Sequence, residues 1–258
     1  MQNKFIIVVP VYNGEQWIEH CLDSIWRQNY KNYRVVVIDD CSTDSTYNIL
    51  KTYRNFHIIK NDKRLASGLA NTVQGIKFLS DDPEDIIVSI DGDDYLADNN
   101  VLSYLNTIYK EDIWLTYGSF LPVSGRYSGT CQPFEKARIV KENGNYDYII
   151  LSAQTYRKSG YWITSHLKTF KRWLWDKIDD RDLRNENGEY YKMAWDMPFM
   201  YPMIEMADSH IKFIDKILYY YNDLNPICIG AQTPVEQIRE GENIQNKQIY
   251  ARIDDHIL

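Results

Sequence analysis

The sequence predicts an α/β fold built as a single continuous domain. Short β-branched runs alternate with amphipathic segments through the first hundred residues, and no linker divides the 258-residue chain cleanly. A strand–helix–strand series of this kind forms a mostly parallel sheet with helices on both faces. The composition agrees, because 44% hydrophobic and 25% charged residues are ordinary values for a globular protein.

Four apolar runs in this region predict the strands of the sheet. They lack the alternation of polar and apolar residues, which is typical of strands that are covered on both faces. The runs are Phe5–Val9, Val35–Ile38, His57–Ile59 and Ile86–Ile90.

Helical spacing of apolar residues predicts the helices that connect these strands. Apolar residues between Trp17 and Ile25 recur on one helix face, as do those between Leu69 and Leu79. Between these two segments, Ser42-Thr43-Asp44 provides the N-cap chemistry of another helix.

The pattern becomes weaker after about residue 112, although the second half should still build on the first sheet. We expect strands, helices and one long loop there. The strands are Ile113–Phe120 and Lys212–Tyr221, the helices are Thr169–Ile178, Pro198–Ala207 and an amphipathic C-terminal helix over Pro234–Ile257, and the loop is 122–147.

Charge and cysteine content argue against several functional classes. With 29 Lys and Arg against 36 Asp and Glu, the net charge of −7 argues against a broad basic nucleic-acid surface, while a local basic groove stays open. The four cysteines form no CxxC pair, which favours a cytoplasmic location over a disulfide framework or a zinc site. The apolar run Phe5–Val9 ends at Pro10, too short for a signal peptide or a membrane span. Peripheral membrane association stays open.

Polar residues follow each predicted strand, at the edge where open α/β sheets bind ligands. Asp39-Asp40 and Asp91-Gly92-Asp93-Asp94 bring acids from two strands to that edge. Clustered carboxylates repel one another unless a cation neutralises them, and hard oxygen ligands suit Mg²⁺ or Mn²⁺. A single aspartate is equally well explained as a loop residue or a helix cap, so the coincidence of the two groups carries the prediction.

The order of these motifs resembles glycosyltransferase family 2. The resemblance is strong over residues 4–105, looser over 106–225 and weak beyond. It rests on Val9–Asn13, on Ser24 and Gln28, on Val37–Thr46 and on Asp91–Asp94. It implies the GT-A fold, with residues 1–105 as a nucleotide-sugar-binding half, 106–225 as an acceptor-binding half and 226–258 as a C-terminal helical segment.

The resemblance also implies roles in binding the nucleotide. The loop formed by Pro10, Val11, Tyr12 and Asn13 would line the nucleotide pocket, where Tyr12 could stack on the base. Asp39 would accept a hydrogen bond from the N3–H group of uracil, a donor that cytosine lacks.

Further roles are implied beside the diphosphate. Asp93 would hold the metal ion, with Asp91 and Gly92 beside the ribose and diphosphate. Lys63 and Arg64 would lie near the phosphates, although a solvated loop pair explains them equally well.

The chain departs from the family pattern at two positions. Cys41 stands where a glycine is usual, which we interpret as one small residue replacing another. Trp195 stands where a glutamate normally precedes the catalytic aspartate, so that Asp196 alone would be the base. Asp196 could also cap a helix, because Pro198 follows two residues later.

Weaker candidates occur in the second half. His166 and His210 could touch metal, diphosphate or acceptor, but lone histidines are more often structural. Tyr219–Asn222 and Asn225-Pro226 resemble a late strand and a loop that closes over the nucleotide, or else a packed aromatic strand end. The tryptophans at 162, 173, 175 and 195 could stack on sugars or fill the core.

The sequence therefore predicts an inverting glycosyltransferase that depends on Mn²⁺ or Mg²⁺. It would transfer a sugar from a UDP-sugar to a hydroxyl of a glycan or another acceptor. A non-catalytic nucleotide- or glycan-binding module is the alternative. A sugar nucleotidyltransferase is less favoured, because no Gly-rich loop follows the first strand, and the absence of GxGxxG argues against a dinucleotide oxidoreductase.

Overall fold

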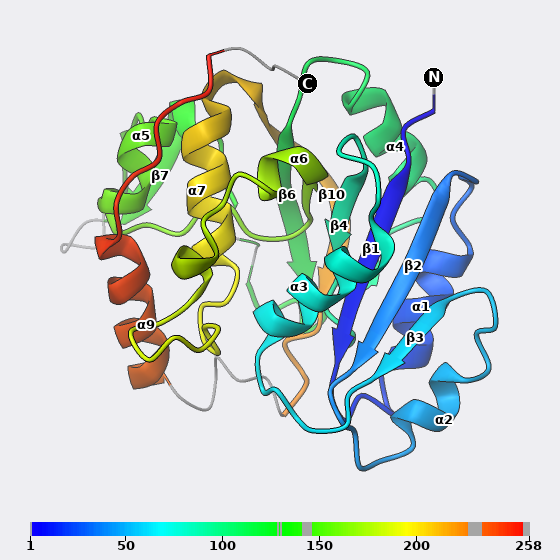
Figure 1. Cartoon of the computed structure of the whole chain (residues 1–258). Helices are drawn as coiled ribbons and strands as arrows, with labels where there is room; N and C mark the ends of the chain where they lie inside the picture. Colours follow the sequence, from blue (N-terminus) through cyan, green and yellow to red (C-terminus); the bar gives the residue numbers. More distant parts are fainter. Residues whose placement is uncertain (1, 128, 130, 141–145, 227–233, 255–258) are drawn as a thin grey trace.

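A mixed sheet forms the centre of the molecule (Figure 1). The computed structural model describes residues 2–127, 129, 131–140, 146–226 and 234–254, and the elements below are those found there. The strands are β1 Phe5–Val11, β2 Tyr33–Asp39, β3 His57–Lys60, β4 Ile86–Ser89, β5 Tyr95–Leu96, β6 Leu115–Pro122, β7 Ala137–Val140, β8 Tyr146–Ile149, β9 Lys168–Lys171 and β10 Ile211–Tyr221. The central sheet has eight of these strands, in the order β3-β2-β1-β4-β9-β6-β10-β5.

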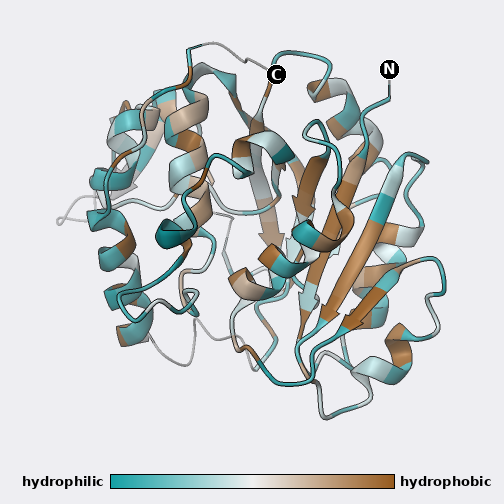
Figure 2. Ribbon diagram, in the orientation of Figure 1, coloured by the Kyte–Doolittle hydropathy of each residue, from teal (hydrophilic) through white to brown (hydrophobic). Residues whose placement is uncertain are grey.

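The first four strands confirm the predicted parallel arrangement. β1 pairs in parallel with β2 and β4, and β2 pairs in parallel with β3. All seven residues of β1 are buried, and both β1 and β2 are largely hydrophobic in Figure 2.

The helices are α1 Ile18–Trp26, α2 Thr46–Leu50, α3 Gly68–Leu79, α4 Val101–Ile108, α5 Ala153–Tyr156, α6 Arg172–Trp175, α7 Met197–Ala207 and α9 Pro234–Asn246. Helix α3 covers one face of β1 and β2, and α1 lies behind them (Figure 1).

The second half of the chain extends the same sheet. The expected strands 113–120 and 212–221 are β6 and β10, which pair in parallel. Strand β9 lies between β4 and β6 and is antiparallel to both, while β5 is antiparallel to β10. We did not predict β5 or α4 from the sequence. The sheet crosses from one half to the other without a break.

Two expected elements in the second half were wrong. The helix expected over Thr169–Ile178 is instead the buried strand β9 followed by the short helix α6. The apolar spacing looked helical because Phe170 enters the core from a strand, whereas Trp173 and Leu174 enter it from the helix. The loop expected over 122–147 contains β7 and the start of β8, which pair as an antiparallel hairpin.

The C-terminal segment is helical over a shorter length than predicted. Helix α7 confirms the helix expected over 198–207, but α9 ends at Asn246 rather than near residue 257. The chain then runs along α7, where the Tyr250 amide donates to Glu205 Oε2 (3.0 Å) and the Ile253 amide donates to the Met206 carbonyl (3.0 Å). These bonds replace the helical hydrogen bonds of a continued α9. The expected residues 255–257 lie outside the described part of the chain.

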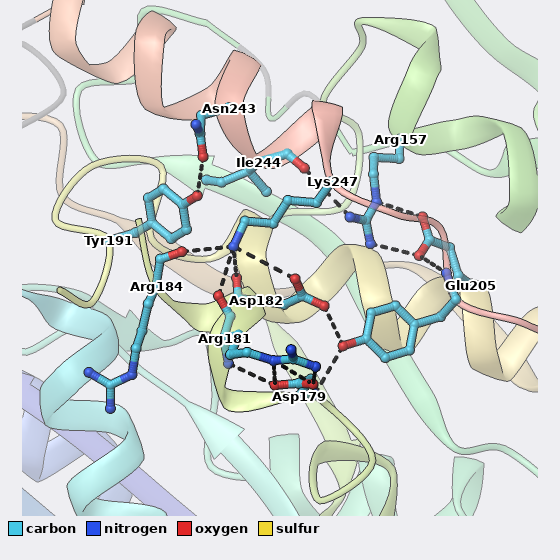
Figure 3. A network of polar contacts seen from close by, with 11 residues as sticks. Arg157, Asp179, Arg181, Asp182, Arg184, Tyr191, Glu205, Asn243, Ile244 and Lys247 are labelled. Atoms are coloured by element: carbon cyan, nitrogen blue, oxygen red, sulfur yellow. Dashed lines mark hydrogen bonds and ion pairs between the residues drawn. The ribbon is translucent and has the colours of Figure 1, made fainter. Parts of the chain in front are cut away.

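A polar network fastens α7, α9 and the turn at Asp180–Leu183 to one another (Figure 3). The buried guanidinium of Arg157 donates from Nε and Nη2 to the two carboxylate oxygens of Glu205, at 2.7 and 2.6 Å. Lys247 Nζ donates to three backbone carbonyls of the turn, those of Arg181, Asp182 and Arg184, at 2.9, 3.1 and 2.7 Å. The network holds α7 in place.

Candidate active site

The residues predicted to bind a nucleotide meet at the carboxyl ends of β1, β2 and β4. The Asp40 amide donates to the Val11 carbonyl at 2.8 Å, and the Gly92 amide donates to the Pro10 carbonyl at 3.1 Å. These bonds continue the pairing of β1 with its two neighbours past the ends of the strands. Parallel topology thus brings three separate sequence motifs to one edge.

Gly92 is required by the protein's own packing. A Cβ atom on this residue would lie 2.7 Å from the Val11 Cβ and 3.0 Å from the Pro10 carbonyl oxygen. The resemblance placed Gly92 beside the ribose and diphosphate. The structure shows that close packing against the end of β1 also requires a glycine here, and this packing fixes the course of the acidic loop.

The loop after β1 is fastened to the loop after β2. Asn13 has a left-handed backbone (φ 48°), its amide donates to Ser42 Oγ, and its side-chain oxygen accepts from the Thr43 amide, both at 2.9 Å. Cys41 also has a positive φ of 65°. This explains the usual glycine at its position, because glycine adopts such a conformation without strain.

Asp39 and Asp40 are adjacent and both buried, but their surroundings differ. Asp40 accepts hydrogen bonds from the amides of Leu65 and Ala66 and from Asn61 Nδ2, at 2.8 to 2.9 Å, so its role is structural. Asp39 accepts from the Ser42 amide through Oδ1 only. Its Oδ2 is buried without a partner among the described residues. A buried acceptor of this kind costs free energy unless a ligand donates to it.

Tyr12 and Arg64 lie against each other. The Arg64 guanidinium stacks on the Tyr12 ring, 3.7 Å from its centroid. This cation–π contact brings Arg64, from the loop after β3, to the nucleotide loop, while Lys63 beside it is exposed. Arg64 therefore occupies one face of the ring that we expected to stack on a base.

The acidic loop after β4 is tied to the end of β10. Asp94 is fully buried and accepts from Tyr219 Oη at 2.6 Å and from the Asn222 amide at 2.7 Å. Asp93 Oδ2 accepts from Asn225 Nδ2 at 2.7 Å. The sequence signal for Asp94 was its place in the acidic run, but its structural role depends on partners about 130 positions away.

The acids in this loop differ in how open they are to a cation. Burial raises the pKa of Asp91 to about 7; nearby Lys168 opposes the shift, while Asp93 and Asp196 add to it. Burial also raises the pKa of Asp93 and, further, that of Asp94. A divalent cation would relieve this crowding, so the donor set fits Mg²⁺ or Mn²⁺. Because both oxygens of Asp94 already accept hydrogen bonds, Asp91 and Asp93 are the more accessible ligands.

His166 lies beside the acidic loop and His210 does not. A carboxylate oxygen from each of Asp91 and Asp94 and one His166 ring nitrogen lie within 4.8 Å of one another, close enough to share a cation. The His166 ring stacks on Tyr219, with centroids 4.7 Å apart. His210 stacks on Trp114 at the start of β10, the opposite end of the strand, and is structural there.

Asp196 stands at the first turn of α7 without capping it. Its position is that of the N-cap, but its side chain makes no capping hydrogen bond. Instead, Asp196 Oδ2 accepts from Lys168 Nζ on β9 at 3.1 Å. Trp195 packs on the start of α3, where a Cβ on Gly68 would lie 2.8 Å from the ring. We did not identify Lys168 from the sequence, because its partner lies 28 positions away.

The remaining tryptophans of the second half belong mainly to the core. Trp173 and Trp175 are buried, the former against Trp114 and the latter stacked on Phe170. Trp162 packs on Tyr201 of α7.

Among the described residues, no helix is long and apolar enough to cross a membrane.

Comparisons with known proteins identify the family of the chain. The family model described as glycosyl transferase family 2 matches residues 6–162, more than half of the chain. The poly(ribitol-phosphate) beta-glucosyltransferase of Bacillus spizizenii is 32% identical over 129 residues, which are 48% of this chain and 20% of that protein. The chain thus matches only a small part of that much longer relative.

Solved structures show the same fold at low identity. TarS of S. aureus in complex with UDP-GlcNAc gives a TM-score of 0.61 at 21% identity, covering 95% of this chain and 62% of that one. The mannosyltransferase PcManGT of Pyrobaculum calidifontis in complex with GDP-Man and Mn²⁺ gives 0.58 at 15% identity, covering 97% and 66%. The chain therefore belongs to glycosyl transferase family 2, a family of transferases, and has the GT-A fold predicted from its motifs.

Proposed function

We propose that the protein is an inverting, metal-dependent glycosyltransferase that transfers a sugar from a UDP-sugar to a hydroxyl of a glycan or another acceptor. One observation carries the proposal: the acidic loop of the first half and Asp196 of the second lie around the same two side chains. A His166 ring nitrogen lies within 4.8 Å of an Asp91 carboxylate oxygen, and Lys168 Nζ lies 3.3 Å from His166 Nδ1 and 3.1 Å from Asp196 Oδ2. A donor held at the acidic loop would therefore lie within reach of a carboxylate on the acceptor side.

The nature of the donor follows from Asp39. Its unpartnered Oδ2 is suited to accept the N3–H group of uracil, whereas cytosine offers an acceptor at that position. Pro10, Val11, Tyr12 and Asn13 would frame the base, and Arg64, with Lys63, would lie towards the phosphates. The UDP-GlcNAc complex of TarS supports a UDP-sugar, while the GDP-Man complex of PcManGT is a reason to test other nucleotides.

Mn²⁺ or Mg²⁺ would be held through Asp93, with Asp91 and Gly92 beside the ribose and diphosphate. When bound, such an ion neutralises charge on the departing diphosphate. The complex of PcManGT with GDP-Man and Mn²⁺ supports a metal ion as part of this proposal.

Asp196 would accept the proton of the acceptor hydroxyl as that oxygen attacks the anomeric carbon. A single displacement from the opposite face inverts the configuration of the sugar, so no covalent nucleophile is needed. Lys168 would hold the carboxylate during this step, because it donates to Oδ2 at 3.1 Å.

Asp93→Asn and Asp196→Asn variants test these two roles. The assay is UDP, GDP or dTDP release from a panel of nucleotide sugars with Mn²⁺, in the presence of sugar acceptors or water. We expect a UDP-sugar to be turned over. Asp196→Asn should lose activity about 10²- to 10⁴-fold, the range for a general base, and Asp93→Asn should lose the activity that depends on Mn²⁺. Wild-type turnover in either variant would remove that residue from its role.

A non-catalytic nucleotide- or glycan-binding module is the alternative function. It predicts UDP binding by the wild-type chain without transfer or donor hydrolysis across the panel. The cytoplasm remains our predicted location, and peripheral contact with a membrane remains compatible with a lipid-linked acceptor.

A further inference from the structure

Lys168 is a buried cation whose partners all belong to the candidate active site. It lies on β9 and is 1% exposed. Its Nζ lies 3.1 Å from Asp196 Oδ2, 3.3 Å from His166 Nδ1 and 5.6 Å from the centroid of the Trp195 ring. Asp91 of the acidic loop lies beside His166, because one of its carboxylate oxygens and a His166 ring nitrogen are within 4.8 Å of each other. An ammonium removed from water in this way needs compensating negative charge.

Most groups around this ammonium are uncharged near neutral pH. Burial and then Lys168 lower the pKa of His166 well below its ordinary value, so His166 is a neutral acceptor. Burial raises the pKa of Cys131 and of Tyr201 to about 12, so both keep their protons. Among the described residues, the ion-pair partner of Lys168 is therefore Asp196.

The contact with Lys168 gives the two carboxylate oxygens of Asp196 different surroundings. Oδ2 accepts from Lys168, and among the described residues the structure gives Oδ1 no hydrogen-bond donor. The side chain is 18% exposed, so Asp196 remains open to solvent while Lys168 is closed off. Since the carboxylate does not cap α7, its orientation depends on Lys168.

We infer that Lys168 is a positioning residue: its ammonium holds Asp196 Oδ2, so that Oδ1 faces the acceptor. This inference rests on the proposed function, in which Asp196 is the base. It adds a residue on β9 that contacts both the base on α7 and His166, the neighbour of the acidic loop after β4.

The same strand offers a matched control. Lys171 is also buried on β9 and also pairs with an acid, donating from Nζ to Glu84 Oε2 at 2.7 Å. Glu84 lies just before β4, at the end of the sheet opposite to the acidic loop. A merely structural role for buried lysines of β9 would therefore appear in variants of either residue.

The experiment compares Lys168→Met, Lys168→Arg, Lys171→Met and Asp196→Asn. The assay is UDP release from UDP-GlcNAc or UDP-glucose with Mn²⁺. We expect Lys168→Met to lower kcat about tenfold or more, part of the 10²–10⁴-fold effect of a general base, with little change in KM. Lys168→Arg should recover part of kcat, and Lys171→Met should keep the wild-type value.

Different outcomes separate this inference from the proposed function. Wild-type kcat in Lys168→Met, or an equal loss of kcat in Lys168→Met and Lys171→Met, while Asp196→Asn is inactive, would overturn the inference alone. Wild-type activity in Asp196→Asn would overturn the base assignment itself. Calorimetric binding of UDP shows whether each variant is folded, and Lys168→Gln replaces the methionine variant if that one fails to bind.

Discussion

Neighbouring aspartates in this protein have different roles, which can be told apart by the hydrogen bonds that their carboxylates accept. Asp40 and Asp94 accept hydrogen bonds through both oxygens and hold loops together, whereas Asp39 keeps one buried oxygen without a partner among the described residues. The sequence predicted which acids reach the ligand-binding edge, because strand ends can be located from β-branched runs. The sequence could not predict which of these aspartates bind a ligand and which hold loops together. The hydrogen-bond partners of Asp94, for example, come from β10 and the loop after it.

The role of Cys41 could not be predicted from the sequence either. From the sequence, its replacement of a usual glycine looked like an exchange of small residues. The structure shows that the position requires a left-handed backbone, with φ of 65°, which a non-glycine residue adopts at a cost. A left-handed backbone at a non-glycine residue cannot be predicted from the composition or from the spacing of apolar residues.

The acidic loop predicts how stability depends on pH. The folded pKa of Asp91 is raised to about 7, so the folded state holds a proton that the unfolded state releases near pH 4. The metal-free protein should therefore lose stability as the pH rises from about 4 to 7, because deprotonation then favours the unfolded state. Each kcal/mol lost lowers Tm by about 2–4 °C in a chain of this size.

Thermal unfolding of the metal-free wild type and of Asp91→Asn from pH 5 to 8 measures this effect. The variant removes the titrating group, so its Tm should fall less over the same range. Mn²⁺ should raise the wild-type Tm more at pH 8 than at pH 6. Equal slopes for the two proteins, and an effect of Mn²⁺ independent of pH, would contradict the description of this loop.

At the scale of elements, the parallel strands were predictable and β9 was not. Strands β1 to β4 are apolar runs that any covered parallel sheet requires. Strand β9 reads Lys-Thr-Phe-Lys, whose two charges argue against a buried strand. Both lysines are neutralised by acids far along the chain, Asp196 and Glu84, so the evidence for this strand lies in its tertiary partners.

The buried ion pair between Arg157, which follows α5, and Glu205 of α7 predicts how strongly these two elements are held together. Arg157 and Glu205 are each about 1% exposed, and arginine stays charged in any protein environment. Glu205→Gln leaves that charge unpaired and should lower the free energy of unfolding by about 3–5 kcal/mol. Arg157→Met should cost less, because burial already raises the pKa of Glu205, which can then take up a proton.

Urea unfolding of both variants at pH 5.5 and 8 measures the difference. The penalty for Arg157→Met should shrink at the lower pH, where Glu205 is protonated more easily, while that for Glu205→Gln should hardly change. Equal penalties for the two variants at both pH values would show that the network in Figure 3 is not organised around the arginine charge.

At the scale of the whole molecule, one sheet joins the two halves that the motifs distinguished. Strands β9, β6 and β10 continue the sheet begun by β1 to β4, so acids from both halves reach the same edge. The net charge of −7 excludes a broad basic surface but is compatible with a nucleotide that binds through a cation. Sequence spacing predicted the first half well because its motifs are local, whereas the second half is specified by long-range pairing.

The central claim is that this edge binds a uridine nucleotide through Asp39 and a divalent cation. The most direct measurement is calorimetric titration of the wild type and of Asp39→Asn with UDP and CDP, with and without Mn²⁺. The wild type should bind UDP tightly only with Mn²⁺ and CDP much more weakly. Asp39→Asn, which keeps Oδ1 for Ser42 but offers an amide donor at the other position, should lose the preference for UDP. Equal binding of UDP and CDP by the wild type, or binding unaffected by Mn²⁺, would contradict the claim.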